Sequence, residues 1–215
     1  MTIMLWGRRS SANVQKVLWA LEEVGADYAV TELGGPFGGL DRADYRTLNP
    51  NGLVPTLVDA ETVVWESHAI LRYLAAEYAS GLLWPTEPRL RAVADQWTDW
   101  AQTTFQPAWI SAFRQVVRTP KAQHDAGAIA AALDRTLQAF GLLEARLSTV
   151  PYVAGADFTY ADIANGVALY RWMTMEIDRP AMPGVEAWYA RLQERPAFRA
   201  VVCVSYADLV GVLSF

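Results

Sequence analysis

The chain has 215 residues, of which 53% are hydrophobic and 19% are charged, and its formal net charge is −5. This composition predicts a compactly folded protein with one large or two modest domains, and it excludes a disordered chain. Because Lys and Arg are scattered rather than clustered, we expect no nucleic-acid partner. No window reaches about 18 uncharged apolar residues, so we also expect no membrane span.

The N-terminal sequence MTIMLWGRRSS places two arginines after a short apolar run, with no apolar segment behind them. A secretory signal has the opposite order, so we expect none. The single cysteine, Cys203, excludes an internal disulfide and fits a reducing compartment. We therefore expect a cytoplasmic protein. Two distant histidines and Cys203 have no ligand spacing, so we expect no metal.

The first eighty residues alternate between strand and helix patterns. They predict a strand at 3–6, a helix at 14–24, a strand at 28–33, a glycine-rich region, strands at 56–59 and 62–65, and a helix ending near residue 78. This order, β-α-β followed by β-β-α, predicts a thioredoxin-like α/β domain over residues 1–80.

Strand patterns disappear after the segment SGLLWPTEP. Its glycine and two prolines predict a linker at 81–88, followed by an all-α helical bundle over residues 89–215. The bundle begins with a long helical pattern at 89–118, in which Pro107 should cause a kink or an interruption. Further helices are predicted at 126–147 and 183–195, and Thr159 with Asp162 predicts a capping box at the start of a buried helix.

Three backbone features occur together in residues 49–74, NPNGLVPTLVDAETVVWESHAILRYL. A turn precedes Val54-Pro55, where the proline favours a cis bond and removes one ladder donor, so the Val54 backbone can face a peptide-like ligand. A hairpin then leads to Glu66-Ser67 at the first turn of a helix, where free N–H groups collect. The segment therefore predicts a ligand cradle.

These motifs resemble the glutathione-binding half of cytosolic glutathione transferases, and the capping box resembles the one in their helical domain. The resemblance covers nearly the whole chain and implies glutathione as co-substrate. It implies that Val54, before Pro55, pairs with the cysteinyl part of glutathione, that Glu66 binds the ammonium group, and that Ser67 binds the γ-glutamyl carboxylate. Leu53 departs from many relatives, which place a polar or basic residue there to meet the glycyl carboxylate.

Conjugation by glutathione needs its thiolate, and an unperturbed thiol has a pKa of about 8.5. Lowering that pKa by about two units takes about 2.7 kcal/mol. A helix N-terminus at up to about 2 kcal/mol and one hydrogen bond at about 1.5–3 kcal/mol would suffice. The donor should therefore lie between the first strand and the first helix.

That turn contains no tyrosine and no cysteine, so the donor to the thiolate should be a serine or an asparagine. The pattern Ser11-x-Asn13-x-x-Lys16 resembles bacterial transferases of the serine or asparagine type, theta-like or nu-like. We expect Ser11 to be the principal donor to sulfur and Asn13 the second, with Ser10 as the alternative. Either serine could instead have a purely structural role, as the N-cap of the helix.

Three further features surround this expected site. Phe37, in the loop GGPFGG, could cover the ligand or belong to a plain exposed loop. Phe105, Trp109 and Phe113 share one face of the kinked helix, which makes them an apolar co-substrate pocket or simple core. The tail 201–215 could close that pocket or lie in a subunit contact. His68 edges the cradle, although a lone, partly exposed histidine is usually structural.

We therefore expect a glutathione transferase with a role in detoxification, which joins glutathione to a small hydrophobic electrophile. By resemblance alone we expect a homodimer. Two alternatives stay open. The protein could reduce disulfides with glutathione, or it could be a non-catalytic, glutathione-binding stress protein.

Overall fold

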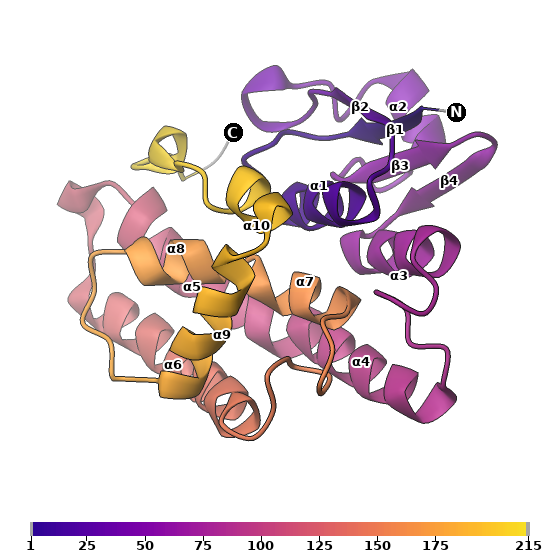
Figure 1. Ribbon diagram of the computed structural model, residues 1–215. Coiled ribbons are helices and arrows are strands. Elements are labelled where there is room, and N and C mark those ends of the chain that lie inside the picture. The colour runs from indigo at the N-terminus through magenta and orange to yellow at the C-terminus, as the bar shows by residue number, and fades with distance from the viewer. Residues whose placement is uncertain (1, 214–215) are drawn as a thin grey trace.

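The computed structural model describes residues 2–213, which form a small sheet-containing part and a larger helical part (Figure 1). The strands are β1 (Ile3–Trp6), β2 (Tyr28–Thr31), β3 (Thr56–Asp59) and β4 (Thr62–Trp65). The helices are α1 (Ala12–Val24), α2 (Ala43–Leu48), α3 (Ser67–Tyr78), α4 (Pro88–Trp100), α5 (Gln106–Phe113), α6 (Ala126–Leu147), α7 (Tyr160–Gly166), α8 (Leu169–Thr174), α9 (Pro183–Gln193) and α10 (Pro196–Val201). No helix within residues 2–213 is long and apolar enough to cross a membrane.

The sheet has the order β2-β1-β3-β4, in which β1 pairs in parallel with β2 and antiparallel with β3, and β3 pairs antiparallel with β4. The predicted thioredoxin-like arrangement and the helical second part are thereby confirmed. Two details differ. Strand β2 ends at Thr31, and the region predicted to be irregular contains α2 and a short 3-10 turn at Gly35–Phe37.

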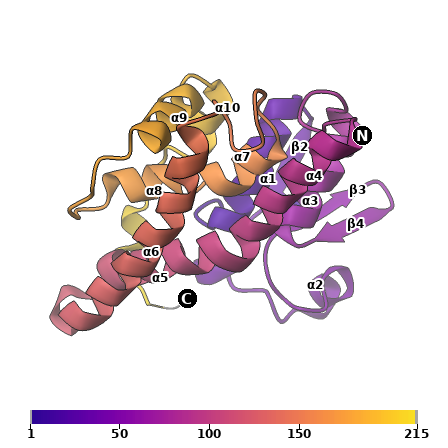
Figure 2. The ribbon, with the colours of Figure 1, turned by 90° about the horizontal axis from the view of Figure 1, so that it is seen from below.

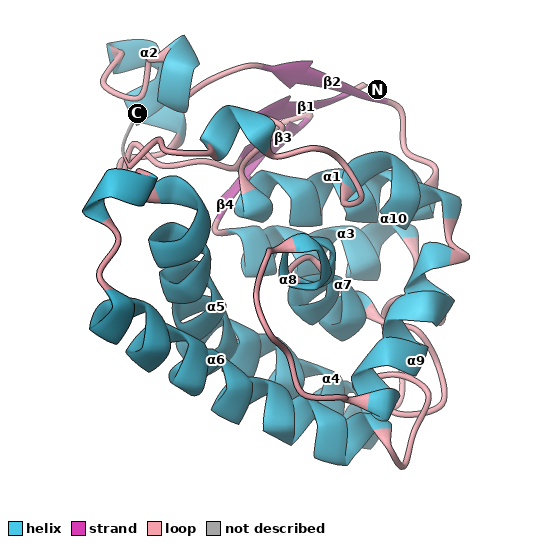
Figure 3. Cartoon of the chain, turned by 90° about the vertical axis from the view of Figure 1, so that its left-hand side faces the viewer, coloured by secondary structure: helices cyan, strands magenta, loops and turns pink. Residues whose placement is uncertain are grey.

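Helix α1 lies between the sheet and the helical part (Figures 1 and 3). The sequence pattern assigns Gln15 and Lys16 to its polar face, yet both are buried with the apolar residues, at 1% and 0% exposure. The reason is that α1 packs against α3, α7 and α10, while the sheet covers it from the other side (Figures 1 and 3). An amphipathic pattern therefore marks the face toward the sheet but does not predict that the opposite face is also covered.

The two parts meet at a tightly packed interface. Trp19 of α1 is fully buried, and its ring lies 4.8 Å from that of Phe198 in α10. Gly166 of α7 permits this approach, because a Cβ there would lie 3.1 Å from the Trp19 ring and 2.8 Å from Leu192. The Trp19 indole N–H also donates to Glu23 at 2.8 Å.

The long helical stretch from Pro88 to Arg118 is continuous, and Pro107 does not break it (Figure 2). A π-helical turn at Ala101–Phe105 precedes the proline, and a second one at Arg114–Arg118 ends the stretch. Proline lacks an N–H and its ring clashes with the carbonyl four residues earlier, and a π-turn relieves both conflicts by widening the helix locally. The predicted interruption therefore takes the form of a π-turn.

The segment between α3 and α4 is folded against α7. Leu83 is buried, and its carbonyl accepts a hydrogen bond from the Tyr160 N–H at 3.3 Å. The Trp84 ring stacks on that of Tyr160 at 5.4 Å. The predicted capping box is present: the Thr159 side chain accepts from the first turn of α7, and the Asp162 carboxylate accepts from the Thr159 N–H at 2.9 Å.

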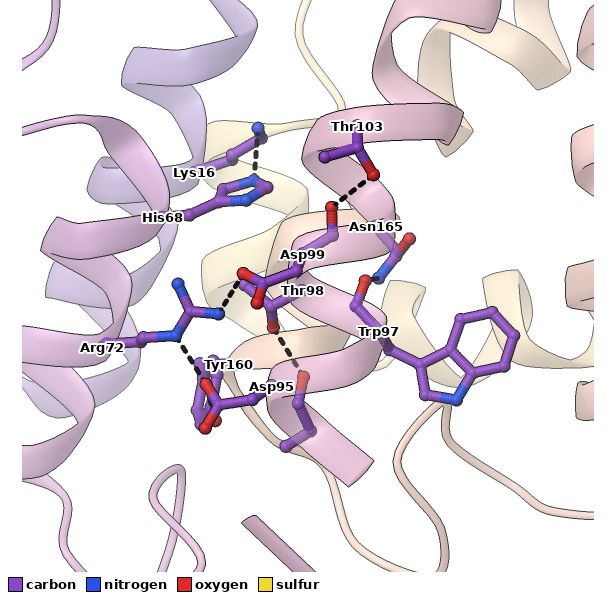
Figure 4. Close-up of polar contacts among 11 residues, drawn as sticks. Lys16, His68, Arg72, Asp95, Trp97, Thr98, Asp99, Thr103, Tyr160 and Asn165 are labelled. Atoms are coloured by element: carbon purple, nitrogen blue, oxygen red, sulfur yellow. Dashed lines mark hydrogen bonds and ion pairs between the residues drawn. The ribbon is translucent and has the colours of Figure 1, made fainter. Parts of the chain in front are cut away.

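Lys16 joins three helices across the interface, and Figure 4 shows its contact with His68. Its Nζ donates to Asn13 Oδ1 of α1 at 3.2 Å, lies 2.8 Å from His68 Nε2 of α3 and donates to Gln106 Oε1 of α5. These three acceptors match the three donors of an ammonium group. His68, expected to be partly exposed, is 5% exposed.

Burial shifts Lys16 and His68 toward their neutral forms. It lowers the pKa of Lys16 to about 7, and the charge of Glu66 acts in the opposite direction. Burial, followed by the charges of Lys16 and Arg72, lowers the pKa of His68 to about 2. His68 is therefore neutral at physiological pH, so its Nε2 can accept a hydrogen bond from Lys16.

This depressed pKa makes a prediction about stability. Lys16 has a pKa of about 7 in the folded chain, against the ordinary 10.5. Between these values the unfolded chain binds one proton more than the folded chain, so the Lys16 contribution to stability increases as pH rises through this window. We expect the free energy of unfolding of the native protein, minus that of Lys16→Met, to rise between about pH 7 and about pH 9, by at most about 1.4 kcal/mol per unit.

Urea denaturation of both proteins across this window measures the difference. The matched control is Lys121→Met, because Lys121 is the other lysine of the chain and is exposed. For Lys121→Met, the difference in the free energy of unfolding from the native protein should stay constant with pH. A constant difference for Lys16→Met as well would contradict the depressed pKa.

Candidate functional site

The turn between β1 and α1 presents two serines and an asparagine at the start of a helix. Ser11 occupies the N-cap position, with φ −76° and ψ 125°, but its side chain makes no cap hydrogen bond. The Ser11 side chain therefore does not cap α1. Its half-exposed hydroxyl is available to a ligand at the positive end of this helix.

Gly7 brings this turn close to the second loop of the site. Its φ is 152°, and a Cβ at this position would lie 2.5 Å from Val14 and 3.2 Å from Val54. Only glycine fits such a close approach. Gly7 is not among the site residues predicted from the sequence, although a glycine directly after a predicted strand is a signal for such a position.

The Val54-Pro55 peptide bond is cis, and neighbouring side chains hold the loop before it. Asn49 Nδ2 donates to the Leu53 carbonyl at 2.9 Å, and the hydroxyl of buried Tyr45 donates to the same oxygen at 2.5 Å. With its carbonyl accepting both bonds, Leu53 has a fixed backbone, while its side chain is 60% exposed. The loop thus presents the Val54 backbone from a rigid support.

Glu66 and Ser67 lie where β4 passes into α3. Glu66 has a φ of 70°, a value that non-glycine residues rarely adopt and that is often found at ligand sites. Its side chain is exposed, whereas Ser67 is buried and donates to Asn13 Oδ1 at 3.4 Å. The start of α3 is therefore linked directly to the first turn of α1.

Asn13 has a defined amide orientation because of these contacts. Its Oδ1 accepts from Lys16 Nζ at 3.2 Å and from Ser67 Oγ at 3.4 Å. An ammonium group can only donate, so the oxygen must face Lys16 and the NH₂ group faces away from it. Asn13 thereby offers N–H donors to a ligand.

Two cavities meet at Asn13. A small one of about 50 Å³ is lined by Asn13, Asn49, Leu53, Val54, Pro55, Glu66 and Ser67. A larger one of about 250 Å³ is lined by Ser10, Ser11 and Asn13 and by the rings of Trp109 and Phe113, among other residues. A group bound in the first cavity at Asn13 therefore lies next to the opening of the second.

Two predicted residues lie outside these cavities. Phe105 is 1% exposed, stacks on Trp100 at 5.4 Å and contacts Phe140 edge-on at 4.9 Å, so it packs in the core. Phe37 is 56% exposed in the turn after β2. By contrast, the C-terminal segment does reach the larger cavity, which Leu209 and Leu213 line; residues 214–215 of the predicted tail lie outside the described residues.

Two hydrogen bonds hold this segment beside the larger cavity. Arg118 Nε donates to the Val212 carbonyl at 2.7 Å, and the Gly211 N–H donates to the Val117 carbonyl at 2.9 Å. The chain after α10 is thus fixed to the end of the long helix. Within residues 2–213, no group of three His, Cys, Asp or Glu side chains could hold a metal ion.

Comparisons with known proteins agree with this geometry. Family models described as the N-terminal and C-terminal domains of glutathione S-transferase match residues 10–77 and 126–191. Glutathione S-transferase GstB of Escherichia coli (strain K12) is 41% identical over 94% of this chain and 98% of its own. Disulfide-bond oxidoreductase YfcG of the same strain is 29% identical over 86% of this chain and 87% of its own.

A solved structure gives the same result. The theta class glutathione S-transferase from the citrus canker pathogen Xanthomonas axonopodis pv. citri, with glutathione bound, matches with a TM-score of 0.91 and 48% identity, over 95% of this chain and 98% of that one. Two domain models and a relative of similar length, 41% identical, thus cover both parts of the protein. The chain belongs to the glutathione S-transferase family.

Proposed function

We propose that the protein transfers glutathione, as its thiolate, to a small electrophile. One observation carries this proposal: the two cavities meet at Asn13, beside a Ser11 hydroxyl that makes no cap hydrogen bond. Glutathione occupies the small cavity and the mouth around it, and the electrophile occupies the larger one. We propose the same division for the domains, with residues 1–80 binding glutathione, 81–88 linking, and 89–215 supplying the electrophile pocket.

The contacts with glutathione follow from the backbone geometry. The Val54 N–H and C=O, next to Pro55, pair with the cysteinyl amide. The N–H groups at the start of α3 and the Ser67 hydroxyl, which turns from Asn13 Oδ1 to the ligand, bind the γ-glutamyl carboxylate, as helix N-termini commonly bind anions. The exposed Glu66 carboxylate binds the ammonium group. Leu53 offers no charge to the glycyl carboxylate, so this end of glutathione is held less firmly.

The sulfur lies at the start of α1. Ser11 Oγ–H donates to the thiolate, the Asn13 amide N–H supports it, and the dipole of α1 adds to the same stabilisation. Trp109 and Phe113 enclose the electrophile on the apolar side. In this arrangement the protein contributes mainly position and anion stabilisation, and no residue forms a covalent intermediate.

The role of Ser11 is tested by Ser11→Ala. Removing one hydrogen bond to a charged acceptor should raise the pKa of bound glutathione by about 1–2 units and lower kcat by about 10- to 100-fold. The KM for glutathione should change little, because the backbone contacts are retained. Thiolate absorbance against pH and steady-state conjugation of a chlorinated aromatic electrophile measure the two effects.

Ser10→Ala is the matched control, since Ser10 lines the same cavity one residue earlier. It should have the smaller effect. If Ser10→Ala lowers kcat more than Ser11→Ala does, the sulfur donor is Ser10. If both variants keep the native rate constant, neither hydroxyl stabilises the thiolate.

Glutathione-dependent disulfide reduction is the second candidate, because a relative named as a disulfide-bond oxidoreductase is 29% identical to this chain. Assaying a mixed glutathione disulfide beside the aromatic electrophile separates the two activities. Tight glutathione binding without turnover of either substrate would indicate a non-catalytic binding protein instead.

We further propose a cytoplasmic homodimer in which the first domain of one protomer meets the second domain of its partner. The edge strand β4 supports this, since Val63 and Trp65 are 40% and 39% exposed and single chains rarely leave an apolar edge strand uncovered. Sedimentation velocity at micromolar concentration should give twice the mass of one chain. A single-chain mass at that concentration would contradict the dimer.

A further inference from the structure

One arginine of the helical part holds the backbone of the turn that carries Ser11. Arg171 of α8 is 6% exposed, and its Nη2 donates to the Ser10 carbonyl at 2.7 Å. Ser10 lies outside α1, because Ser11 is the N-cap and the Ser11 carbonyl accepts the first bond of the helix, from the Gln15 N–H at 2.8 Å. The Ser10 carbonyl therefore needs a donor from outside the helix, and a side chain 161 residues away supplies one.

The same nitrogen of Arg171 also contacts the first turn of α1. Its Nη2 donates to Gln15 Oε1 at 3.1 Å, and Gln15 Nε2 donates in turn to the Val201 carbonyl of α10 at 3.2 Å. The two contacts of this buried amide agree on which of its atoms is the oxygen. Arg171 is thus bound to the chain on both sides of Ser11, at Ser10 and at Gln15, which restricts how the backbone between them can turn.

Two other arginines hold irregular segments of the chain in the same way. Arg146 donates to the carbonyls of residues 153–154 at 3.0 and 3.1 Å, and Arg179 donates to carbonyls within 173–177 at 2.9 to 3.2 Å. A guanidinium suits this role because it offers several N–H donors in a fixed planar geometry. Arg171 differs from these two arginines in the segment that it holds, which carries the proposed donor to sulfur.

Arg171 also lies at the wall of the larger cavity. It lines this cavity together with Ser11 and Phe113, and its guanidinium carbon is 5.0 Å from the centroid of the Phe113 ring. Burial lowers the pKa of Arg171 to about 10, so the side chain is still charged and donating at physiological pH. One side chain therefore connects the turn that holds the thiolate with a ring that encloses the electrophile.

We propose that Arg171 is a positioning residue, which fixes the backbone from Ser10 to Ser11 so that the Ser11 hydroxyl faces the sulfur of glutathione. Because the Ser11 side chain makes no cap hydrogen bond, its position depends on that of its backbone. Anion stabilisation needs a donor already in place, and a displacement of about 1 Å can cost about 100-fold in rate. This inference rests on the proposed transferase function and adds the residue that places its sulfur donor.

Arg171→Ala removes both contacts and tests this role. We expect the pKa of the thiol of bound glutathione to rise by about one unit and kcat to fall by about tenfold, within the range of one hydrogen bond to a charged acceptor. The KM for glutathione should change little, because the proposed contacts of Val54, Glu66 and Ser67 do not involve Arg171. Thiolate absorbance against pH and steady-state conjugation of a chlorinated aromatic electrophile measure these quantities.

Arg146→Ala is the matched control. It also removes hydrogen bonds from a half-buried arginine to backbone carbonyls, in a segment that lines neither cavity of the site. Urea denaturation should show a lower free energy of unfolding for both variants, whereas only Arg171→Ala should change the thiol pKa and kcat. Equal changes in the two variants would overturn the inference, since they would reflect lost stability.

A double-mutant cycle with Ser11→Ala shows whether Arg171 acts through Ser11. Once the hydroxyl is absent its placement has no effect, so adding Arg171→Ala to Ser11→Ala should lower kcat by less than about twofold. A loss of about tenfold in both backgrounds would overturn the inference, because Arg171 would then act independently of Ser11.

Arg171→Lys provides a second variant if Arg171→Ala does not fold, because it keeps the positive charge and most of the volume. Its ammonium ends one bond short of the guanidinium nitrogens, so it should hold the Ser10 carbonyl less well and lower kcat by about two- to fivefold. Native kcat and native thiol pKa in this folded variant would overturn the inference.

The transferase function itself is tested separately, with the native protein. If the native protein conjugates the electrophile and folded Arg171→Ala has the same thiol pKa and kcat, the inference fails and the transferase function stands. If the native protein conjugates no electrophile, the transferase function fails, and the inference fails with it.

Discussion

The side-chain nitrogen of Lys16 lies where the sheet-containing part meets the helical part, and it contacts Asn13, which lines both cavities. Its three partners come from α1, α3 and α5. Each contact has a separate consequence: the one to Asn13 orients a donor toward the cavities, the one to His68 fixes α3 against α1, and the one to Gln106 ties α5 to both. Replacing Lys16 would therefore affect the site and the interface together.

The site is rigid because α1 is rigid. The helix is buried over most of its length, and Trp19 is enclosed by Phe198 and Phe158, with rings 4.8 and 5.8 Å away. Gly166 removes the one Cβ that would push α7 off this ring. This packing fixes the rotation of the helix. The direction in which its first turn presents Ser11 and Asn13 is therefore set by contacts about 9 to 12 Å away along the axis, at about 1.5 Å per residue. Preorganisation of this kind is what stabilising an anion requires.

The parts of the fold that depend on local chemistry could be predicted from the sequence. The turn, the Val54-Pro55 bond, the hairpin and the start of α3 each follow from residues that are neighbours in the chain, and so does the capping box of α7. Contacts between distant residues could not be predicted in this way. Gln106 lies 90 residues from Lys16, and Arg171 lies 161 residues from Ser10, so no pattern along the chain indicates that they meet.

The case of Phe105 shows a second limit. The spacing of Phe105, Trp109 and Phe113 places all three on one face of a regular α-helix, yet Trp109 and Phe113 line the cavity and Phe105 packs against Phe140. The helix is regular from Phe105 to Phe113, so the three side chains do keep one face. Trp100 and Phe140 cover that face at Phe105, whereas the cavity lies beside Trp109 and Phe113. Spacing along a helix predicts a shared face but not which part of that face another element covers.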